Sequence, residues 1–592
     1  MTETTRTLTA QNPTQHAMLI VWGHYGREIG LLDQLAKVPI PQKQVLRAPY
    51  EKLAEFLIGL LSGIEYLSDL SEGAAPLMRD NEVAVAWGLA KLADASGVSK
   101  TLKACHEQTV VMLEQALETV SQPFWERAVA DLRQKRKVFL LDADLTGRPV
   151  SSSSVTFPEA AFGYMDGEIR LGYQLAEICL QTDLYGRQWL GAQHHPGNTV
   201  SATCLLGLLQ MAEQRLRCHP RRRTDLLQQR LEACQIQLTE LQQRAKEPTV
   251  RMNDQEKRLA RLQGQIRLAQ VEVALLQPSS PSSRQAGPYS RLNRLKKQLA
   301  GWEGQRQRAQ VKLEQLRKTV QHYQTRIQTL RAEWQRLQTR WERLGQENAT
   351  QVDPPQFRIR LDAGFSSGEN LTDLLELGYE VETKSANDAL VKALQRRANA
   401  EQTNWQRVGK NAEMVAWTDY RISSCPYRLT VGLERFHTPK GLRHAVLIRS
   451  QPDAPTVGPD LQTWFYHYNG RQTIEAGNKE EKTTFKVQHL MCRSPAGIRI
   501  QALLTVFAAN FIRWADPWVR THIDQSNRRF ELALSSPKRL VRVAANSPAA
   551  VLHDQDRVIV RFSPLSSFWG VVINLPGHSS YLNQSNDHFA HF

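Results

Sequence analysis

The stretch Val138-Phe-Leu-Leu-Asp142-Ala-Asp144-Leu-Thr146-Gly147 gives the first indication of the fold. Consecutive apolar residues predict a buried strand, and the aspartates and glycine that follow place acidic side chains where the strand ends. Strand-like runs follow at 172–181 and 188–193, and 199–216 has the pattern of a helix. Three strands followed by a helix are the opening of an α/β sheet domain, whose first part we assign to residues 136–217.

The same pattern returns much later in the chain. Phe357-Arg-Ile-Arg-Leu-Asp362-Ala-Gly364-Phe predicts another strand that ends on an aspartate and a glycine turn. A helix and a further strand follow, so we expect residues 350–386 to continue the sheet domain. Residues 387–464 alternate apolar and polar side chains, which predicts a β-rich insertion.

Residues 218–349, which separate the two strand patterns, are rich in Gln, Arg, Leu and Glu. Apolar residues recur at alternating steps of three and four from Leu227 to Leu276 and from Leu292 to Leu344, with a Pro/Ser-rich loop between. The exceptions are Pro248 and Gln255 in the first seam and Arg306 in the second. Two matched seams predict an antiparallel coiled-coil hairpin of roughly 75 Å at 1.5 Å per residue. Pro248 in the first seam predicts a kink or interruption. The Arg- and Gln-rich flanks remain available for DNA or for a second protomer.

A third polar pattern lies in the segment 465–520. Tyr468, Arg471, Glu475 and Lys482 stand at offsets of 0, 3, 7 and 14, which places them on one stripe of a single helix. The carboxylate suits a divalent ion, and the cations suit phosphate oxygens. The alternative is a solvated helix face with charge pairs. The apolar helix expected at 497–519 contains charged residues and should be core rather than membrane-spanning.

Both ends of the chain contain candidate units. Residues 1–135 predict a helical region with a candidate helix–turn–helix at 86–105, turning at Ser96-Gly97. Its second helix would direct Ser99, Lys100 and Lys103 into a major groove, although ordinary helix packing explains the pattern equally well. Residues 521–592 predict a small β unit, with strands beginning at Leu540, Arg557 and Trp569, and a polar tail.

Composition limits the class of protein. A chain of 592 residues should hold three to five units. It carries 75 Lys and Arg against 59 Asp and Glu, a net +16, which suits nucleic acid first and an anionic membrane surface second. Seven scattered cysteines argue against a disulfide framework or a zinc site and for a reducing cytoplasm. The first residues lack the apolar core of a signal peptide.

The carboxylates suggest one reaction class. Either Asp142 or Asp144, together with Asp362 and Glu475, would come together from two adjacent strands and a helix. With two Mg²⁺ ions about 4 Å apart, such a set catalyses in-line phosphoryl transfer. Which of the first two aspartates binds metal stays open; Asp144 is favoured because it lies in the motif described next.

These motifs carry a resemblance. Tyr468, Arg471, Glu475 and Lys482 match the pattern Y-x2-R-x3-E-x6-K, Asp144-Leu-Thr146 matches D-x-T, and Arg360-Leu-Asp362-Ala-Gly364-Phe365 matches R-x-D-x-G-F. The chain thus resembles bacterial insertion-sequence DDE transposases of the Y-R-E-K signature group. The resemblance covers 136–217 and 350–520 and does not extend to the hairpin.

The resemblance implies a fold and an activity. The fold would be a ribonuclease-H-like mixed sheet, giving a multidomain α/β protein with an inserted coiled-coil hairpin, a β-rich insertion and a helical N-terminal region. Asp144, Asp362 and Glu475 would be catalytic and would bind two Mg²⁺ or Mn²⁺ ions. Tyr468, Arg471 and Lys482 would contact DNA.

The implied partners are double-stranded DNA with terminal inverted repeats, target DNA and a second copy of the chain in the synaptic complex. The implied location is the bacterial cytoplasm, at the nucleoid, and no membrane is expected as a partner. Aromatic residues of the β-rich insertion, Trp405, Trp417 or Trp464, would either hold a flipped base or pack in the core.

Two other functions remain open. One is a domesticated ribonuclease-H-like nuclease that cuts DNA without joining it. The other is a catalytically inactive DNA-binding coiled-coil scaffold, against which the intact set of carboxylates argues. Inverted repeats flanking the gene would separate a transposase from the nuclease.

Overall fold

The computed structural model describes residues 9–43, 47–165, 167–276, 291–422, 424–439, 441–450, 460–524, 536–554 and 557–577. The side chain of Glu475 lies outside the described set, although the backbone of its helix is described. The chain divides into two compact units: a hairpin unit, Arg222–Val352, and a main unit formed by the residues on either side of it.

The main unit is built on one large mixed sheet. Its strands, in their order across the sheet, are β3 (Ala161–Met165), β4 (Glu168–Thr182), β2 (Phe139–Pro149), β6 (Phe357–Leu361), β7 (Glu380–Lys384), β11 (Gly441–Ser450), β10 (Arg428–Thr438), β9 (Ala412–Arg421) and β8 (Gln406–Arg407), with β5 (Gly186–Pro196) also paired to β4. β2, β4 and β5 are antiparallel, whereas β6 and β7 run parallel to β2. The strands predicted on either side of the hairpin therefore belong to one sheet.

The β-rich alternation of 387–464 continues this sheet. After α11 (Asp388–Ala400), strand β11 pairs antiparallel with β7, so the three long strands β9, β10 and β11 extend the same sheet. Alternation along a strand reports one buried face but does not report which neighbour the strand pairs with. The sequence therefore predicts these strands without predicting that they join the sheet that carries the aspartates.

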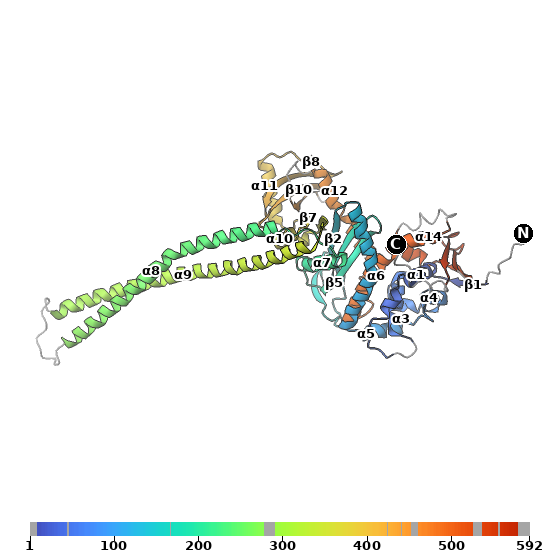
Figure 1. The fold of residues 1–592 in the computed structure, drawn as a ribbon, viewed down its shortest axis with the longest axis horizontal. Helices are drawn as coiled ribbons and strands as arrows, with labels where there is room; N and C mark the ends of the chain where they lie inside the picture. Colours follow the sequence, from blue (N-terminus) through green and yellow to red (C-terminus); the bar gives the residue numbers. More distant parts are fainter. Residues whose placement is uncertain are drawn as a thin grey trace. The chain divides into compact units, whose positions relative to one another are not determined.

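Helices pack on and beside the sheet (Figure 1). They are α1 (Ala17–Glu28), α2 (Leu31–Leu35), α3 (Pro49–Ser62), η1 (Leu67–Leu70), η2 (Leu77–Arg79), α4 (Asn81–Ala86), α5 (Ala95–Ala104), α6 (Glu107–Gln134), α7 (Ser201–Leu216), η3 (Ala363–Phe365), α10 (Gly368–Leu377), α12 (Leu461–Asn469), α13 (Gln472–Thr484), α14 (Pro495–His522), α16 (Pro537–Arg539) and the π-helical turn η4 (Leu540–Ala544). By length and composition α14 is apolar enough to cross a membrane, but 83% of its most apolar window is buried in the fold. It packs against α3, α6 and β5 and so forms the centre of the largest core, as the sequence predicted.

The predicted helix–turn–helix at 86–105 is not formed. The Asp94 carboxylate accepts a hydrogen bond of 2.6 Å from the Gly97 N–H, so Asp94 is an N-cap and α5 begins at Ala95. Ser96-Gly97 therefore lies in the first turn of a helix rather than between two helices. The sequence pattern missed this cap because glycine in a first helical turn is read as a turn signal.

The C-terminal β unit contains a strand from the other end of the chain. The order of its sheet is β1 (Thr9–Thr14), β12 (Ala549–Asp554), β13 (Arg557–Phe562) and β14 (Val572–Pro576), with antiparallel pairing throughout.

The strand predicted at Leu540 is wrong, because Pro537 stands in the first turn of a helical segment. Leu540, Val541 and Ala544 are buried, which is a helical spacing.

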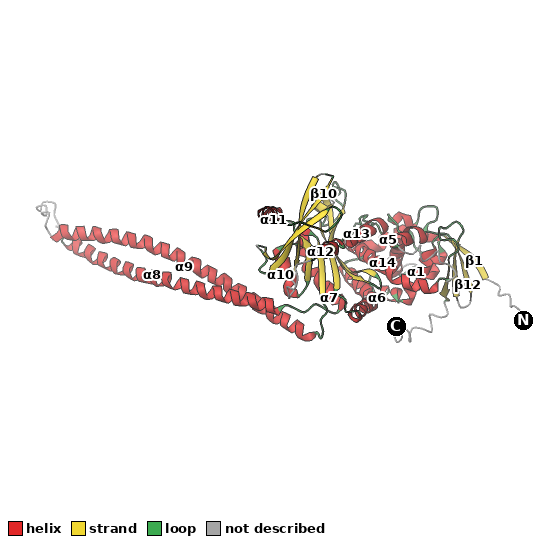
Figure 2. Cartoon of the chain, turned by 90° about the horizontal axis from the view of Figure 1, so that it is seen from above, coloured by secondary structure: helices red, strands yellow, loops and turns green. Residues whose placement is uncertain are grey.

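The hairpin unit consists of α8 (Thr224–Leu275) and α9 (Arg291–Thr350), which run side by side (Figure 2). Cross-links between their side chains and backbones define an antiparallel register: Arg222–Glu347 at 2.6 Å, Gln255 to the Ala309 carbonyl at 3.1 Å and Arg317–Glu256 at 2.8 Å. The buried residues belong to the predicted seams. The interruption expected at Pro248 is not observed, because α8 continues through it.

Replacing Arg222–Val352 with a short Gly/Ser bridge should leave the main unit folded. The ends of the hairpin meet, because the Asn348 amide accepts from the Arg222 N–H at 2.7 Å and donates to its carbonyl at 3.0 Å. Because the two ends of the removed segment lie side by side, its removal should change the free energy of unfolding of the main unit little. Circular dichroism melting should show a cooperative transition within a few degrees of the full chain. Loss of cooperative unfolding would show that the hairpin is required for the fold.

Candidate active site

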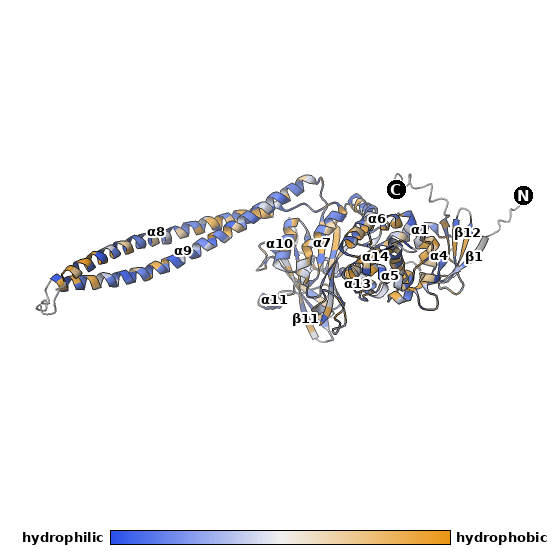
Figure 3. Ribbon diagram, turned by 90° about the horizontal axis from the view of Figure 1, so that it is seen from below, coloured by the Kyte–Doolittle hydropathy of each residue, from blue (hydrophilic) through white to orange (hydrophobic). Residues whose placement is uncertain are grey.

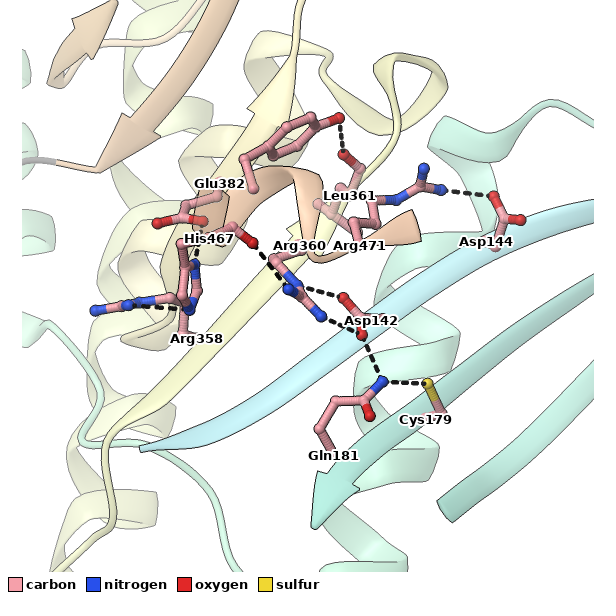
Figure 4. Close-up of polar contacts among 11 residues, drawn as sticks. Asp142, Asp144, Cys179, Gln181, Arg358, Arg360, Leu361, Glu382, His467 and Arg471 are labelled. Atoms are coloured by element: carbon pink, nitrogen blue, oxygen red, sulfur yellow. Dashed lines mark hydrogen bonds and ion pairs between the residues drawn. The ribbon is translucent and has the colours of Figure 1, made fainter. Parts of the chain in front are cut away.

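Asp142 is the most buried carboxylate of the central strands, with 0% of its residue surface exposed. Arg360 on the neighbouring strand donates to it twice, from Nε to Oδ1 at 2.7 Å and from Nη2 to Oδ2 at 2.8 Å (Figure 4). Gln181 on β4 donates to Oδ2 at 2.8 Å. Both carboxylate oxygens are thus occupied by donors on the two flanking strands, which is the environment of a structural charge.

Asp144 lies two residues further along the same face of β2 and is partly exposed. The parallel register sets Asp142 beside Arg360, so two more residues bring Asp144 level with Asp362, just past the end of β6. The Asp362 Oδ1 accepts from the Gly364 N–H at 2.9 Å and caps the turn η3. β2 continues to Pro149, so Asp144 lies within the strand and not at the strand end that the sequence predicted. The register still brings the two predicted carboxylates level on adjacent strands, which favours Asp144 over Asp142 as the first site residue.

The residues of the Y-R-E-K pattern do not share a single helix. α12 ends at Asn469 and α13 begins at Gln472. The His467 carbonyl, which a continuous helix would bond to the Arg471 N–H, instead accepts Arg360 Nη1 at 2.8 Å. A Cβ at Gly470 would stand 2.6 Å from that same Arg360 nitrogen. The break follows from the close approach of Arg360, which the pattern of residues 468–482 does not contain.

The break turns two signature side chains toward the strand ends. Arg471 is 7% exposed, and its Nη2 donates to Asp144 Oδ1 at 2.8 Å. The Tyr468 hydroxyl is buried and donates to the Leu361 carbonyl at 3.2 Å. Both side chains therefore bind protein groups in this structure, and their contact with DNA phosphates stays a prediction.

Glu475 and Lys482 lie on α13. This helix packs against β2, the strand of Asp144, while the Glu475 side chain itself falls outside the described residues. Lys482 is half-buried in the last turn of the helix. Gly477 allows α13 to lie close to β5, because a Cβ there would overlap the Arg187 guanidinium.

A second set of charges anchors α12 to the strands. His467 Nδ1 stands 2.6 Å from Glu382 Oε2 on β7, and its Nε2 stands 3.4 Å from Arg358 Nη1 on β6. Arg358 also donates to Glu380 at 2.6 Å. These contacts hold the end of α12 over the two parallel strands that follow β2, where Asp362 emerges.

Glu177 is a site residue that the motifs did not identify. It lies on β4 directly opposite Asp144 in the ladder and is 1% exposed. Arg148, further along β2, is fully buried. Burial lowers its pKa to about 10, and the negative charge of nearby Glu177 opposes this decrease. A single acidic residue inside the apolar run Leu175-Ala-Glu177-Ile was the available signal, because buried carboxylates are rare unless they are paired.

The other predicted residues lie elsewhere. Ser99, Lys100 and Lys103 are on α5, which packs against α3 and α14, with the two lysines exposed. Trp464 and Trp417 are buried, and the Trp417 indole donates to Glu401 at 2.9 Å, which supports the core-packing alternative for both. Trp405 lies under the Arg435 guanidinium at 4.1 Å.

His194 and His195 belong to strand β5. The His194 ring packs against Tyr173 at 4.6 Å between centroids. Burial, with Arg148 and Arg499 nearby, lowers the pKa of His194 to about 3. His194 is therefore a neutral packed side chain.

Among the described side chains, no group of three or more His, Cys, Asp and Glu residues is arranged to hold a metal ion. Asp144 and Asp362 place two carboxylates level on adjacent strands, and carboxylate oxygens are ligands that suit a hard divalent cation. Arg471 neutralises Asp144 in this structure, so an ion bound there would compete with that guanidinium.

Comparison with known proteins adds little. No family model and no curated protein matches the chain. Among solved structures, a chain of the cryo-EM structure of piggyBac transposase synaptic complex with hairpin DNA aligns over 91% of this chain and 83% of its own, at 7% identity and a TM-score of 0.37. A TM-score at this level does not identify a fold, so the function has to be argued from the site.

Replacing Asp142 with Asn should destabilise the main unit far more than replacing Asp144 with Asn. Breaking a buried ion pair from one side costs about 3–5 kcal/mol because the remaining charge stays buried. The double variant Asp142→Asn/Arg360→Gln should regain part of the loss, since no unpaired charge remains. Denaturant unfolding of the wild-type chain, the two single variants and the double variant measures these differences in the free energy of unfolding. Equal losses at Asp142 and Asp144 would contradict the structural role of Asp142.

His194 predicts a pH dependence of stability. Its pKa is about 3 in the folded chain and about 6.5 when unfolded, so the unfolded state binds the extra proton between those values. The stability contribution is complete above about pH 6.5 and decreases as the pH falls toward 3. His194→Gln should flatten the decrease in denaturation midpoint between pH 7 and 5, while His437→Gln on the exposed surface should leave it unchanged. A wild-type slope in His194→Gln would refute this.

Proposed function

We propose that this chain is a DNA transposase of the DDE type, related to the Y-R-E-K group of bacterial insertion sequences. The observation that carries the proposal is that Asp144 of β2 lies level with Asp362, which follows the end of the parallel neighbouring strand β6, and that Arg471 of the signature is bonded to Asp144. Residues of three sequence motifs that are distant in the chain thereby meet beside the end of β6.

The topology supports a ribonuclease-H-like core. A meander of three antiparallel strands, β2, β4 and β5, is followed by α7 and by two strands parallel to β2. β6 ends at Leu361, directly before Asp362, and Asp144 lies level with that end on β2, which continues to Pro149. Helix α13 packs against β2 and carries Glu475, the third carboxylate of the proposed set.

The chemistry proposed at this edge is metal-dependent phosphoryl transfer. Asp144, Asp362 and Glu475 would hold two Mg²⁺ or Mn²⁺ ions, which supply an activated water or 3′-hydroxyl and stabilise the leaving oxygen. Arg471 would release Asp144 when the ions bind and would then be close enough to pair with DNA phosphate, as would Lys482. Arg360 would keep Asp142 neutralised throughout, so that only one of the two β2 aspartates takes part.

The proposed substrates and setting follow the same resemblance. They are double-stranded ends with terminal inverted repeats, target DNA, and a second copy of the chain that brings two ends together in the bacterial cytoplasm. A nuclease that cuts without joining would use the same carboxylates. Strand-transfer products from paired ends, or inverted repeats beside the gene, separate the two.

Asp144→Asn, Asp362→Asn and Glu475→Gln should each retain binding to end DNA and lose Mg²⁺-dependent cleavage by roughly 100-fold or more, since metal ligation contributes several kcal/mol to the transition state. Asp388→Asn, an exposed carboxylate at the start of α11, is the matched control and should cleave normally. The assay is cleavage of a labelled end duplex with and without Mg²⁺. Full cleavage by Asp144→Asn or Asp362→Asn would refute the proposed site.

A further inference from the structure

The basic charge of the chain is concentrated in the hairpin unit. Residues 222–352 contain 25 Lys and Arg against 12 Asp and Glu, a net +13 of the chain's +16. The remaining residues hold 50 basic against 47 acidic side chains, which is close to neutrality. The excess that points to a polyanion therefore does not belong to the unit that carries the aspartates.

Within the hairpin, the charge is greatest toward the tip. Between Lys257 and Lys312 the sequence has 12 basic residues and two acidic ones, Glu272 and Glu303. We call the described cations of this stretch the distal cations; they are Lys257, Arg258, Arg261, Arg267, Arg291, Arg294, Lys296, Lys297, Arg306, Arg308 and Lys312. All of them are exposed. Of these, Arg291 alone forms an ion pair with another described residue, Glu272.

The distal cations are not needed to hold the two helices together. The apolar seam serves that purpose, with Leu262, Ile266 and Ala269 of α8 and Ala309 and Leu313 of α9 buried. In Figure 3 the ribbons of α8 and α9 are coloured mostly hydrophilic, with hydrophobic residues interspersed along both helices. Exposed like charges on two packed helices repel one another, and a polyanion that binds them removes the repulsion while releasing counterions.

We infer that the distal half of the hairpin is a binding surface for duplex DNA, recognised through its phosphates and without base readout. Each arm of this surface is about 30 Å long at 1.5 Å per residue. Duplex DNA presents one phosphate charge per about 1.7 Å, so the length offers about 18 phosphates to the ten cations without an ion pair. The inference deepens the proposed function, because duplex DNA is its substrate, and it assigns the salt-dependent affinity to a part of the chain remote in sequence from the aspartates.

An anionic membrane is the competing partner. Leu268, Val271 and Leu275 are 74%, 56% and 80% exposed and form a short apolar stripe on α8. The same stripe continues with Gly264, Arg261 and Lys257, so its apolar part spans about two turns. An interfacial helix needs a longer apolar face than this, whereas phosphate binding needs only the cations.

The test is the salt dependence of duplex binding by the full chain. The distal variant changes Lys257, Arg258, Arg261, Lys296 and Lys297 to Gln. The control variant changes five exposed lysines of the main unit to Gln: Lys37, Lys91, Lys392, Lys410 and Lys538. Both variants lose five positive charges, and glutamine has nearly the helix propensity of lysine and arginine, so the hairpin should keep its helices. Circular dichroism checks helix content.

Binding of a 30-base-pair duplex of arbitrary sequence is measured by fluorescence anisotropy between 50 and 300 mM salt. The slope of log K against log salt should shrink by about 0.9 for each lost phosphate contact, hence by three or more in the distal variant and by less than one in the control. Equal slopes in the two variants would overturn the inference. So would unchanged duplex binding by the distal variant together with lost binding to phosphatidylserine vesicles.

Cleavage separates this inference from the proposed function. At low salt and saturating end duplex, the distal variant should cleave at the wild-type rate, because its changed residues are not in the carboxylate site. If the wild-type chain does not cleave but the slopes differ as expected, the proposed function fails and the hairpin inference stands. If cleavage is normal and the slopes are equal, the hairpin inference fails alone.

Discussion

The buried ion pair between Asp142 and Arg360 determines the geometry of the candidate site. It joins the two parallel strands at the centre of the sheet, and Gln181 completes it from the antiparallel side. A buried charge pair is stable only when its remaining donors are also satisfied. Arg360 meets that requirement with the His467 carbonyl, and this hydrogen bond ends α12. Arg471 is consequently placed at Asp144.

This chain of contacts gives the two β2 aspartates different roles although they share a face. Asp142 is held by a guanidinium on the next strand at hydrogen-bond distance on both oxygens. Asp144, two residues further along β2, lies level with the end of β6. Its partner, Arg471, belongs to the turn between α12 and α13. A contact from a helix–helix turn can be exchanged for a ligand at lower cost than a contact within the sheet, because less of the packed core has to move. The difference in burial thus separates Asp142, whose contacts are structural, from Asp144, for which we propose a catalytic role.

The division of charge between the units has a physical rationale. A nearly neutral main unit can hold a network of partly buried ion pairs around β6, β7 and α12 without a large net repulsion. A net +13 on the residues of the hairpin would destabilise a globular core of similar size, but two extended helices keep their exposed cations far apart along the axis. Long helices are therefore a low-cost place for an excess of cations.

The features that depend on local periodicity could be predicted from the residues alone. Alternating steps of three and four predicted both helices of the hairpin, and apolar runs before Asp142-Ala-Asp144 and before Asp362 predicted two strands of one sheet. The strand end predicted at the first of these runs is wrong, because β2 continues to Pro149. The motifs also selected Asp144 and Asp362, which the tertiary structure then brought level. These inferences succeeded because burial along one element leaves a repeating record in the residues of that element.

How the elements meet depends on contacts between segments that are distant in the sequence. The helix break at Gly470 depends on Arg360, about a hundred residues earlier, and no pattern within 468–482 contains that contact. The extension of the central sheet by β9, β10 and β11, the pairing of β1 with β12, and the position of Glu177 opposite Asp144 are likewise contacts between distant segments. Periodicity reports that a face is buried but not against what, because any apolar partner satisfies the same hydrophobic requirement.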